Sequence, residues 1–486
     1  MDRFIGGIDV KITKLLANVA VKKVVNYQEV DVSNVACDSR SVTQNALFVC
    51  LLGENVDGHD HAEEAKGRGA VALVTTKEIK SDLPQFVVDN SRAALAVIAG
   101  NFYGNPAADM KVITVVGTNG KTSVTEILSE IFLFAGHSAG TIGTLGYKIG
   151  RDRTKGVLTT PDPIDLNKNL AEMRDHGVEY VFLEASAHAV YYDKLAGIKA
   201  NATVFTNLTQ DHLDFFGNME EYAKTKLSYF SLENTSLAVV NSDDAYGRKL
   251  ITAHKLPILT YGIDNPADVF AIDVEEDSFG LSFTINAFDK IERISTPLFG
   301  RFNVYNVMAA ISVAMYFGID LPLAAKALEG ISAVPGRYEV SYVKDRRVIV
   351  DFAHTPDGLQ NLLSDLRNGF GGRIVTVFGC GGDRDRSKRP IMGAIAAKYS
   401  DHLIVTNDNP RFEEERAIAK EILQGVPASA SFDVILDREK AIKKAFDRTF
   451  PGDTVVIAGK GHEDYMEIKG KKFPYNDKVV LQKLNR

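Results

Sequence analysis

The 486-residue chain has no tryptophan, and its three cysteines are Cys37, Cys50 and Cys380. So few cysteines cannot build a disulfide scaffold, and they suit a reducing compartment. No apolar run approaches the length that spans a bilayer, and the first residues lack the apolar core of a signal peptide. Positive charge is not in excess either, because the net charge is −7. We therefore expect a cytoplasmic monomer that binds neither nucleic acid nor a membrane.

The composition is otherwise ordinary, with 45% apolar and 24% charged residues. A chain of this length is expected to contain about three domains. Asn105-Pro106 and Val334-Pro-Gly336 are breaks between patterned segments. We accordingly expect domains at residues 1–107, 108–335 and 336–486.

In the middle of the chain, strand and helix patterns alternate, with strands expected at Tyr180–Glu184, Ala202–Thr206 and Leu237–Asn241. This alternation predicts a largely parallel α/β sheet. Between about 266 and 300, period-two patches and few helix signals predict an antiparallel extension. A helix is expected to follow at Tyr305–Phe317.

The last 150 residues repeat an apolar strand followed by a polar loop five times. These strands are Arg347–Val350, Ile374–Phe378, Leu403–Val405, Val434–Leu436 and Thr454–Ile457. Helical patterns lie between them, so we predict a doubly wound α/β domain. Such sheets bind ligands at the carboxyl ends of their strands, where these loops collect Asp, Arg, His and Gly.

The most informative motif is Gly117-Thr-Asn-Gly-Lys-Thr122, which follows the β-branched run Val112–Val116. It opens onto a helix whose apolar face is expected to consist of Val124, Ile127, Leu128, Ile131 and Phe132. Backbone N–H groups of such a loop, together with the helix N-terminus, form a cradle for phosphate. Lys121 can reach the terminal phosphates, and the Thr122 hydroxyl can hold Mg²⁺. The usual first glycine of the pattern is replaced by Val115. The motif predicts that the protein binds a nucleoside triphosphate.

Other candidate residues stand at strand ends or in polar loops. Glu184 ends a strand, and a carboxylate there suits a metal ligand or a water-orienting group. His212 fits a metal ligand or a hydrogen-bonded turn histidine equally well. Arg389 and Arg411 lie on loops at one sheet edge and suit bidentate recognition of a carboxylate.

Together these motifs resemble the Mur ligase family, the ATP-dependent enzymes that add amino acids during peptidoglycan synthesis. The resemblance runs the length of the chain. It rests on Asp38–Arg40, Asp57–His59, Gly117–Thr122, Thr159–Asp162, Glu184–His188, Thr206–Asp214, Phe302–Asn306, Pro335–Arg337, Asp351–Asp357, Gly379–Pro390 and Gly459–Asp464.

The resemblance implies an N-terminal α/β UDP-binding domain, a central P-loop-type ATPase domain with a parallel sheet, and a C-terminal Rossmann-like domain that binds the amino acid. It also implies a reaction in which ATP phosphorylates the D-glutamate side chain of UDP-N-acetylmuramoyl-L-alanyl-D-glutamate. An amine then attacks the acyl phosphate, and ADP and phosphate are released. The protein mainly positions the reactants and neutralises charge.

The family's ATP-binding and catalytic residues carry over to positions in the loops described above. The resemblance assigns ATP binding to Gly117, Thr118, Asn119, Gly120, Lys121, Thr122, Asn303, Arg337 and Asp351. Catalytic roles fall to Lys121, Glu184, His212, Lys226 and His354. The implied Mg²⁺ ligands are Thr122, Glu184, His212 and Lys226, the last as a carbamate.

Substrate-binding residues carry over in the same way. The UDP-muramoyl-peptide would contact Ser39, Thr159, Thr160, Ser186, Lys194 and Lys226. Asp408-Asn-Pro-Arg411 resembles the signature of members that add meso-diaminopimelate, whose distal carboxylate Arg411 can pair with. The expected diaminopimelate-binding set is Arg389, Asp408, Asn409, Pro410, Arg411, Gly459 and Glu463.

Two departures and several alternatives accompany this interpretation. Lys194 stands where the family carries arginine, and Ala187 replaces a common serine. A lysine-adding member and a folylpolyglutamate synthase are alternatives within the superfamily. A nucleotide-dependent scaffold that has lost catalysis is the alternative from another class, and a transporter-associated ATPase fits less well. Glu184, His212 and Lys226 argue against a scaffold, because mere binding needs no second metal site.

Overall fold

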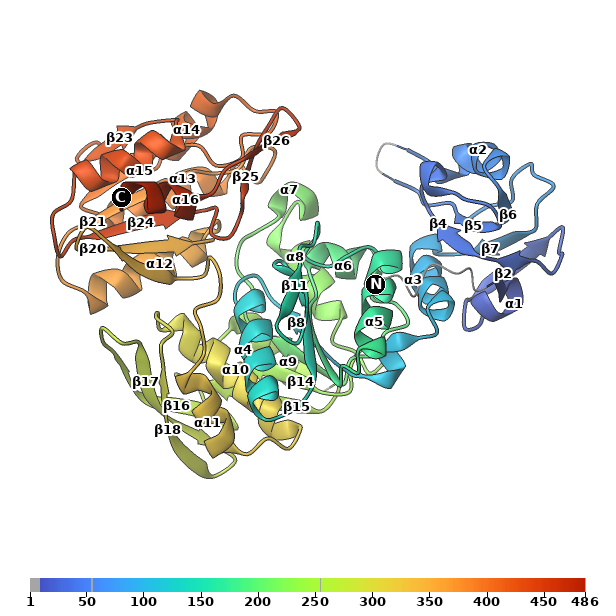
Figure 1. Ribbon diagram of the computed structural model, residues 1–486, viewed down its shortest axis with the longest axis horizontal. Coiled ribbons are helices and arrows are strands. Elements are labelled where there is room, and N and C mark those ends of the chain that lie inside the picture. The colour runs from blue at the N-terminus through green and yellow to red at the C-terminus, as the bar shows by residue number, and fades with distance from the viewer. Residues whose placement is uncertain (1–8, 54–55, 254, 486) are drawn as a thin grey trace. The chain divides into compact units, whose positions relative to one another are not determined.

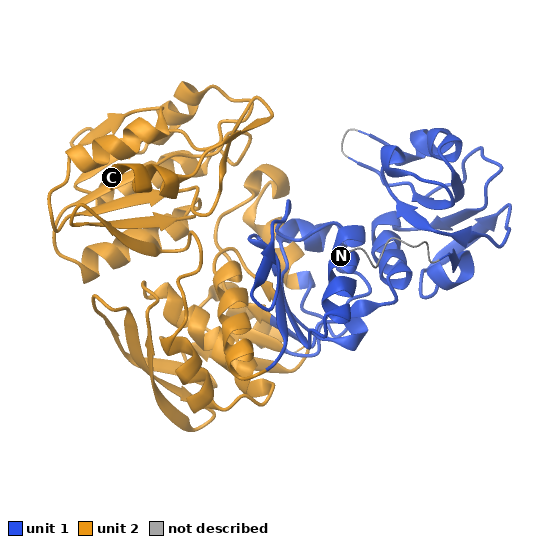
Figure 2. Cartoon of the chain, viewed as in Figure 1, with its two compact units in different colours: residues 1–114, 137–203, 228–237 blue, residues 115–136, 204–227, 238–486 orange. Residues whose placement is uncertain are grey.

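The computed structural model describes residues 9–53, 56–253 and 255–485. The chain forms two compact units, and neither is a continuous stretch of sequence (Figure 2). The first unit contains residues 1–114, 137–203 and 228–237, and the second contains 115–136, 204–227 and 238–486. This division differs in kind from the three sequential domains expected from the sequence, whose boundaries remain a prediction.

The N-terminal part of the first unit is built on a five-stranded sheet (Figure 1). Its order is β2 (Val21–Val25), β7 (Gln85–Val88), β6 (Ala70–Thr75), β5 (Ala46–Val49) and β4 (Asn34–Ala36). β2 is antiparallel to β7, and the other pairs are parallel. The faces alternate along β5, so that α1 (Ile12–Leu15) and α3 (Ser91–Phe102) cover one side and α2 (Ala62–Gly67) the other.

The rest of the first unit places Glu184 at a strand end. β12 (Tyr180–Glu184) is parallel to β9 (Ala139–Gly143), and this confirms the predicted strand. β9, β10 (Gly146–Ile149) and β11 (Asp152–Thr154) are antiparallel neighbours. Two helices complete this region, α5 (Pro163–Asp175) and α6 (Ala187–Tyr191).

β8 (Lys111–Val116) and β13 (Ala202–Phe205) each begin in the first unit and end in the second. After β8, helix α4 (Lys121–Phe134) begins at the lysine of the phosphate loop. Its predicted apolar face is buried, and this face consists of Val124, Ile127, Leu128, Ile131 and Phe132. α7 (Leu213–Phe216) and α8 (Met219–Ser228) follow β13. The structure therefore confirms the strand–loop–helix arrangement that the phosphate loop needs.

Further along the second unit, β14 (Ala238–Asn241), β15 (Ile258–Gly262) and β16 (Val269–Glu276) are parallel, and α9 (Ala245–Ala253) connects the first two. β16, β17 (Leu281–Ala287) and β18 (Lys290–Thr296) are antiparallel, which confirms the predicted extension. α10 (Phe302–Tyr316) begins three residues before the predicted helix, and α11 (Leu321–Glu329) follows it.

The C-terminal region is the predicted doubly wound domain (Figure 1). The sheet order is β19 (Glu339–Val343), β20 (Arg346–Asp351), β24 (Thr454–Ala458), β21 (Ile374–Phe378), β22 (His402–Val405) and β23 (Phe432–Val434). The last five are parallel. The antiparallel strand β19 was not predicted, and β23 begins two residues before the predicted Val434–Leu436.

Helices cover both faces of this sheet. α12 (Pro356–Gly369), α13 (Lys388–Tyr399) and α14 (Glu415–Leu423) pack on one face, and α15 (Arg438–Asp447) and α16 (Asp477–Leu484) on the other. Alternate residues of β21 point to opposite cores, since Val375 and Val377 belong to one and Ile374 and Phe378 to the other. The loops that follow the parallel strands therefore gather at one edge of the sheet.

A buried ion pair secures that edge. Arg438 and Asp477 have side chains that are 0% exposed, and Arg438 donates to both oxygens of Asp477 at 2.9 Å. Arg438 also donates to the carbonyls of Asn407, at 3.1 Å, and Ala458, at 3.0 Å. Ala458 is the last residue of β24 and Asn407 lies two residues after the end of β22, so the ion pair holds the starts of both loops. Across the described residues, no helix has the length and apolar character to cross a bilayer.

Candidate active site

The phosphate loop is held in shape by the segment that follows β13. The Thr118 backbone N–H donates to the Asn207 carbonyl and the Asn119 N–H to the Asn207 side chain, both at 2.9 Å. Gly120 has φ +89°, and a Cβ there would lie 2.6 Å from Asn306 Oδ1. A side chain is therefore excluded where the backbone would approach a phosphate. Lys121 Nζ donates to the Gly117 and Thr118 carbonyls at 2.9 Å, so its charge lies over the loop.

Lys226 is a buried lysine beside this loop. Its Nζ donates to the Gly117 carbonyl at 2.5 Å and lies 4.6 Å from the centroid of the Tyr222 ring. Burial and the nearby charge of Lys121 lower the pKa of Lys226 well below its usual value, while Asp211 opposes this shift. A neutral amine is the form that reacts with carbon dioxide. The environment of Lys226 therefore suits the predicted carbamate.

Asp211 joins several of the predicted groups. It lies in the motif Thr206–Asp214, but no role was predicted for it. Its carboxylate lies 3.3 Å from His212 Nε2, 3.6 Å from His354 Nε2 and 3.4 Å from Lys388 Nζ. Burial raises the pKa of Asp211, but the hydrogen bond from His354 and the charges of His212 and Lys388 hold it well below its usual value. The structure thus brings two predicted catalytic histidines to one buried anion. An acidic residue preceding His212 was the sequence signal for this role.

The segment around β20 brings the other predicted ATP-binding residues to the same unit. Arg337 Nη2 donates to Thr122 Oγ1 at 3.2 Å, and its guanidinium stacks on Phe352. Asp351 accepts the backbone N–H groups of Tyr338 and Ala353 at 2.6 Å, and burial raises its pKa despite Arg337. Asp351 thus joins the backbone just before β19 to the backbone just after β20.

Asn303 lies at the start of α10, in the helix that approaches the phosphate loop. Its amide donates to the Phe299 carbonyl at 2.7 Å and accepts from Asn306 Nδ2 at 2.8 Å. Asn306 is the residue whose Oδ1 excludes a side chain at Gly120. The two asparagines therefore link the α10 N-terminus to the phosphate loop.

In the first unit, the predicted muramoyl-peptide residues form a connected group around Glu184. The Thr144 N–H and hydroxyl donate to the Glu184 carboxylate at 2.8 and 2.9 Å, and Thr159 Oγ1 is 3.2 Å from Thr144 Oγ1. Thr160 Oγ1 donates to the Glu184 carbonyl at 2.7 Å and accepts from the Ser186 N–H at 3.1 Å. Four of the predicted residues are therefore linked by hydrogen bonds.

Lys194 and Ser39 have separate partners in that unit. Lys194 Nζ pairs with Asp162 Oδ1 at 2.7 Å and lies 3.5 Å from the Thr160 carbonyl, so it belongs to the Glu184 group. Ser39 lies in a short 3₁₀ helix, Ser39–Ser41, and donates to Glu64 Oε2 at 2.8 Å. The single charge of Lys194 stands where an arginine would offer a bidentate fork.

The predicted diaminopimelate residues after β22 and β24 meet at the edge of the C-terminal sheet. Asn409 Nδ2 donates to Glu463 Oε2 at 2.9 Å. Gly459 has φ +109°, and a Cβ there would lie 2.6 Å from Asp408 Oδ2, so glycine is needed where the loops approach. Two loops that are distant in sequence therefore form one surface.

A hairpin of β25 (Tyr465–Ile468) and β26 (Lys471–Pro474) holds Arg411. The Arg411 N–H donates to the Glu467 carbonyl at 3.0 Å, and the Lys469 N–H donates to the Arg411 carbonyl at 2.7 Å. Arg411 has φ +50°, which is unusual for a residue with a side chain. Its Nε lies 3.2 Å from Glu467 Oε2, and its Nη1 donates to the Gly382 carbonyl at 2.6 Å. These contacts fix the direction of its guanidinium.

The two arginines near this surface differ in their surroundings. Arg389 is fully buried, and its guanidinium donates to both Glu413 oxygens at 2.7 and 2.8 Å and to Glu421 at 2.8 Å. Loss of solvation and the nearby charge of Arg411 lower the pKa of Arg384. A Cβ on Gly381 would lie 3.8 Å from Arg384 Cγ and 2.9 Å from Arg411 Nη1, so these two arginines approach the same glycine, whereas Arg389 is already paired with two carboxylates. Arg384 was not among the predicted site residues, because a loop with four cations carries no local sign of which one approaches Arg411.

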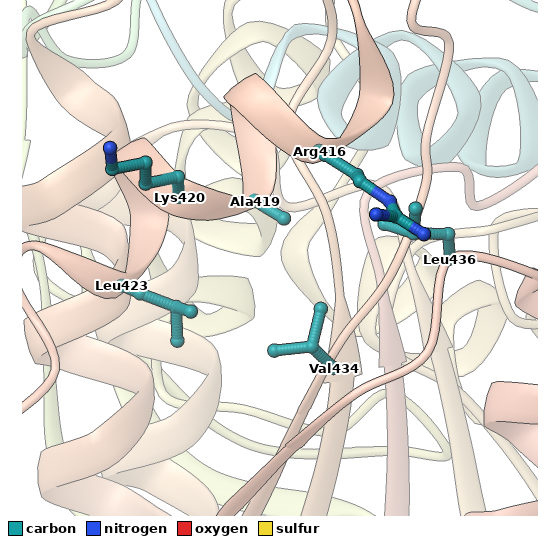
Figure 3. Close-up of a pocket in the computed structure, with 6 residues that line it drawn as sticks. All are labelled: Arg416, Ala419, Lys420, Leu423, Val434 and Leu436. Atoms are coloured by element: carbon teal, nitrogen blue, oxygen red, sulfur yellow. The ribbon is translucent and has the colours of Figure 1, made fainter.

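A surface pocket of the C-terminal region lies between α14 and the segment around β23 (Figure 3). The residues that line it are Arg416, Ala419, Lys420, Leu423, Val434 and Leu436. None of these six is a predicted site residue, so we do not assign the pocket to the reaction.

Comparison with known proteins identifies the family. Three family models match: the Mur ligase family catalytic domain over residues 31–103, the Mur ligase middle domain over 115–314, and the Mur ligase glutamate ligase domain over 336–461. The chain therefore belongs to the Mur ligase family, and it is an ATP-dependent ligase that forms amide bonds.

Individual relatives match over nearly the whole chain. The UDP-N-acetylmuramoyl-L-alanyl-D-glutamate–2,6-diaminopimelate ligase of Syntrophomonas wolfei subsp. wolfei is 40% identical over 484 residues, which cover 98% of this chain and 99% of the relative. The ligase of that name from Bacillus velezensis is 41% identical over 482 residues, covering 97% and 98%. A solved structure of a ligase with this name has a TM-score of 0.70 and 30% identity, and the match covers 98% of this chain and 99% of that chain.

Proposed function

We propose that this chain joins meso-diaminopimelate to UDP-N-acetylmuramoyl-L-alanyl-D-glutamate and converts ATP to ADP and phosphate. The names of its relatives support this, and one observation on the chain itself carries it. A Cβ on Gly381 would lie 2.9 Å from Arg411 Nη1 and 3.8 Å from Arg384 Cγ, so both arginines approach the sheet edge that also presents Asn409 and Glu463. A far end with both a carboxylate and an ammonium group fits that surface, whereas the side chain of lysine offers only the ammonium.

The phosphate loop supplies the donor half of the reaction. The N–H groups at the start of α4 and the charge of Lys121 face the phosphates of ATP, and Arg337 approaches the same helix start through Thr122. The γ-phosphoryl group passes to the D-glutamate carboxylate, and an amino group of diaminopimelate attacks the resulting acyl carbon. Phosphate leaves and the nitrogen loses a proton, so the amide bond replaces the acyl–phosphate bond. The loop neutralises charge throughout.

Mg²⁺ fits the residues beside the loop. When bound, it offsets the negative charge of the phosphates. Thr122 and His212 would hold it, with Lys226 as a carbamate, while Asp211 keeps His212 oriented. In the described residues no three His, Cys, Asp or Glu side chains gather as metal ligands. The carbamate form of Lys226 would therefore be needed to supply a further anionic ligand. The predicted role of Glu184 as a further ligand remains a proposal based on the sequence.

The remaining assignments are proposals of the same kind. We place the UDP-binding domain at residues 1–107, the ATP-binding domain at 108–335 and the amino-acid-binding domain at 336–486. Ser39 and the group around Glu184 would hold the UDP-muramoyl-peptide. The working enzyme would be a cytoplasmic monomer. Of Arg384 and Arg389, Arg384 suits direct pairing with the distal carboxylate better, because Arg389 is already paired with Glu413 and Glu421. Arg389 would support the loop through these two ion pairs.

Phosphate release measured in parallel with meso-diaminopimelate and with L-lysine tests the proposed function. We expect release with diaminopimelate and a product whose mass shows one added residue. A preference for lysine would overturn the specificity, and inactivity with every amino acid would favour a nucleotide-dependent scaffold. Incubation with ¹³C-bicarbonate tests Lys226 separately: a carbamate carbon signal should appear in the parent and be absent from the K226M variant.

A further inference from the structure

Lys460 is a fully buried lysine beneath the amino-acid surface, in the loop that follows β24. Its side chain is 0% exposed, whereas that of Glu463 is 17% exposed. Lys460 Nζ donates to Glu463 Oε2 at 2.8 Å and to Asn409 Oδ1 at 3.1 Å, and it lies 5.6 Å from the centroid of the Tyr465 ring. A buried ammonium group is costly unless it is paired and hydrogen-bonded. The two contacts therefore account for the position of this lysine.

The contacts of Lys460 determine how Asn409 is oriented. Asn409 Oδ1 accepts from Lys460 and from the Glu467 backbone N–H, the latter at 2.9 Å. Because both donors approach the oxygen, the amide nitrogen must point the other way, and it donates to Glu463 Oε2 at 2.9 Å. An amide without the lysine would lose one of the two donors that select this orientation.

The same contacts leave one side of Glu463 available. Oε2 accepts from both Lys460 and Asn409, whereas Oε1 has no hydrogen-bond partner among the residues that the structure describes. Oε1 is thus the atom that can accept from a ligand. Without the ammonium group, this partly buried carboxylate would lose a charge-assisted contact and turn toward water.

We propose that Lys460 is a positioning residue of the amino-acid site, which orients Asn409 and Glu463 so that Glu463 Oε1 receives an ammonium group of the incoming diaminopimelate. Lys460 itself does not touch the amino acid. The inference rests on the proposed function, because it takes the surface around Asn409 and Glu463 as the acceptor site.

The variants K460M and K460Q test the role through steady-state kinetics. Both remove the charge, and K460Q keeps a hydrogen-bond donor. We expect KM for meso-diaminopimelate to rise about tenfold or more, with kcat and the KM values for ATP and the UDP-linked substrate nearly unchanged. K472M is the matched control, because exposed Lys472 lies 4.2 Å from the centroid of the same Tyr465 ring. Its KM values should equal those of the parent.

A double variant separates positioning from general support of the fold. If Lys460 acts only by orienting Asn409 and Glu463, K460M should raise KM for diaminopimelate by a smaller factor in the E463Q background than in the parent. Folded K460M and K460Q with a parental KM would overturn the proposal, as would an additive effect in the double variant. Failure of both single variants to fold would also overturn it, by showing that Lys460 supports the whole domain. An inactive parent would instead count against the proposed function.

Discussion

At the scale of single residues, burial gives several charged side chains their chemistry. Lys226 is 1% exposed, and at this depth an ammonium group loses more solvation than its carbonyl contact restores. Burial therefore favours the neutral amine, which is the form that the predicted carbamate requires. Arg411 shows the opposite outcome, since Glu467 and the Gly382 carbonyl stabilise its charge and orient it. One environment favours chemical modification, and the other favours recognition.

Arg411→Met should raise KM for meso-diaminopimelate by about 10- to 100-fold, because a charge-assisted contact contributes roughly 1.5–3 kcal/mol. The KM for ATP should not change, since the phosphate loop makes no use of this side chain. Steady-state phosphate release at varied diaminopimelate checks the expectation. Exposed Arg416 provides the control, and R416M should behave like the parent. An unchanged KM in R411M would contradict the assigned role.

At the scale of elements, carboxylates on two other elements bind backbone N–H groups at the N-terminus of α10. Glu276 Oε2 on β16 accepts the Gly300 N–H at 2.8 Å, and Asp365 on α12 accepts the Arg301 N–H at 2.9 Å. Both carboxyls lie where the phosphate-binding part of the second unit meets its C-terminal sheet. Burial, with the charge of Asp365, raises the pKa of Glu276 to about 7, and burial raises that of Asp365 to about 6. This junction is therefore sensitive to pH.

Glu276→Gln should stabilise the protein at pH 8 and have little effect near pH 4.5. The pKa of Glu276 is 4.5 in the unfolded chain and about 7 in the folded protein. Between pH 4.5 and about 7 the folded protein therefore binds more protons than the unfolded chain. The stability contributed by the protonated group is complete below pH 4.5 and is lost as pH rises through about 7. Above that range the parent bears a cost of about 1–3 kcal/mol that glutamine removes.

Denaturant unfolding at both pH values measures this difference. E275Q is the matched control on the same strand, since Glu275 is exposed and its ion pair with Arg293 contributes less than about 1 kcal/mol. Equal stabilisation of E276Q at pH 4.5 and pH 8 would show that titration of Glu276 is not the cause.

At the scale of the whole molecule, the predicted substrate sites are divided between the two units. The phosphate loop, Lys226, Arg337 and the amino-acid surface all lie in the second unit, whereas the group around Glu184 lies in the first. The predicted nucleotide site and the predicted amino-acid site therefore belong to the same compact unit. The ion pair of Arg438 with Asp477 supports that body from within.

A non-hydrolysable ATP analogue with Mg²⁺ should slow amide exchange at 117–122 and 206–212. At a hundred times its Kd, a ligand stabilises the binding-competent state by about 2.7 kcal/mol, which corresponds to roughly 100-fold slower exchange through local opening. Hydrogen–deuterium exchange with mass spectrometry measures it. The K121A variant should lose this protection at the same analogue concentration, and protection that survives in K121A would show that nucleotide binds elsewhere.

The sequence by itself determined those parts of the protein that depend on neighbouring residues. The β-branched run and glycine loop predicted the strand, the phosphate cradle and the buried face of α4, because hydrophobic period and backbone freedom are local properties. Repeated strand–loop units likewise predicted the C-terminal sheet. Only the tertiary structure decided the two-unit arrangement, the antiparallel strand β19 and the position of β23, since strand pairing joins segments that are distant in sequence.

The site divides in the same way. Asp408–Arg411 stood out in the sequence, yet the surroundings of Arg384 and Arg389 did not, because four cations share one loop. Asp211 and Lys460 gained their importance only through burial among groups from other loops. The sequence shows which side chains can carry a charge, whereas the fold determines how far each is solvated and which groups it contacts. This is why the resemblance to the family could be recognised from the sequence, whereas the residues that orient the predicted site groups could not be.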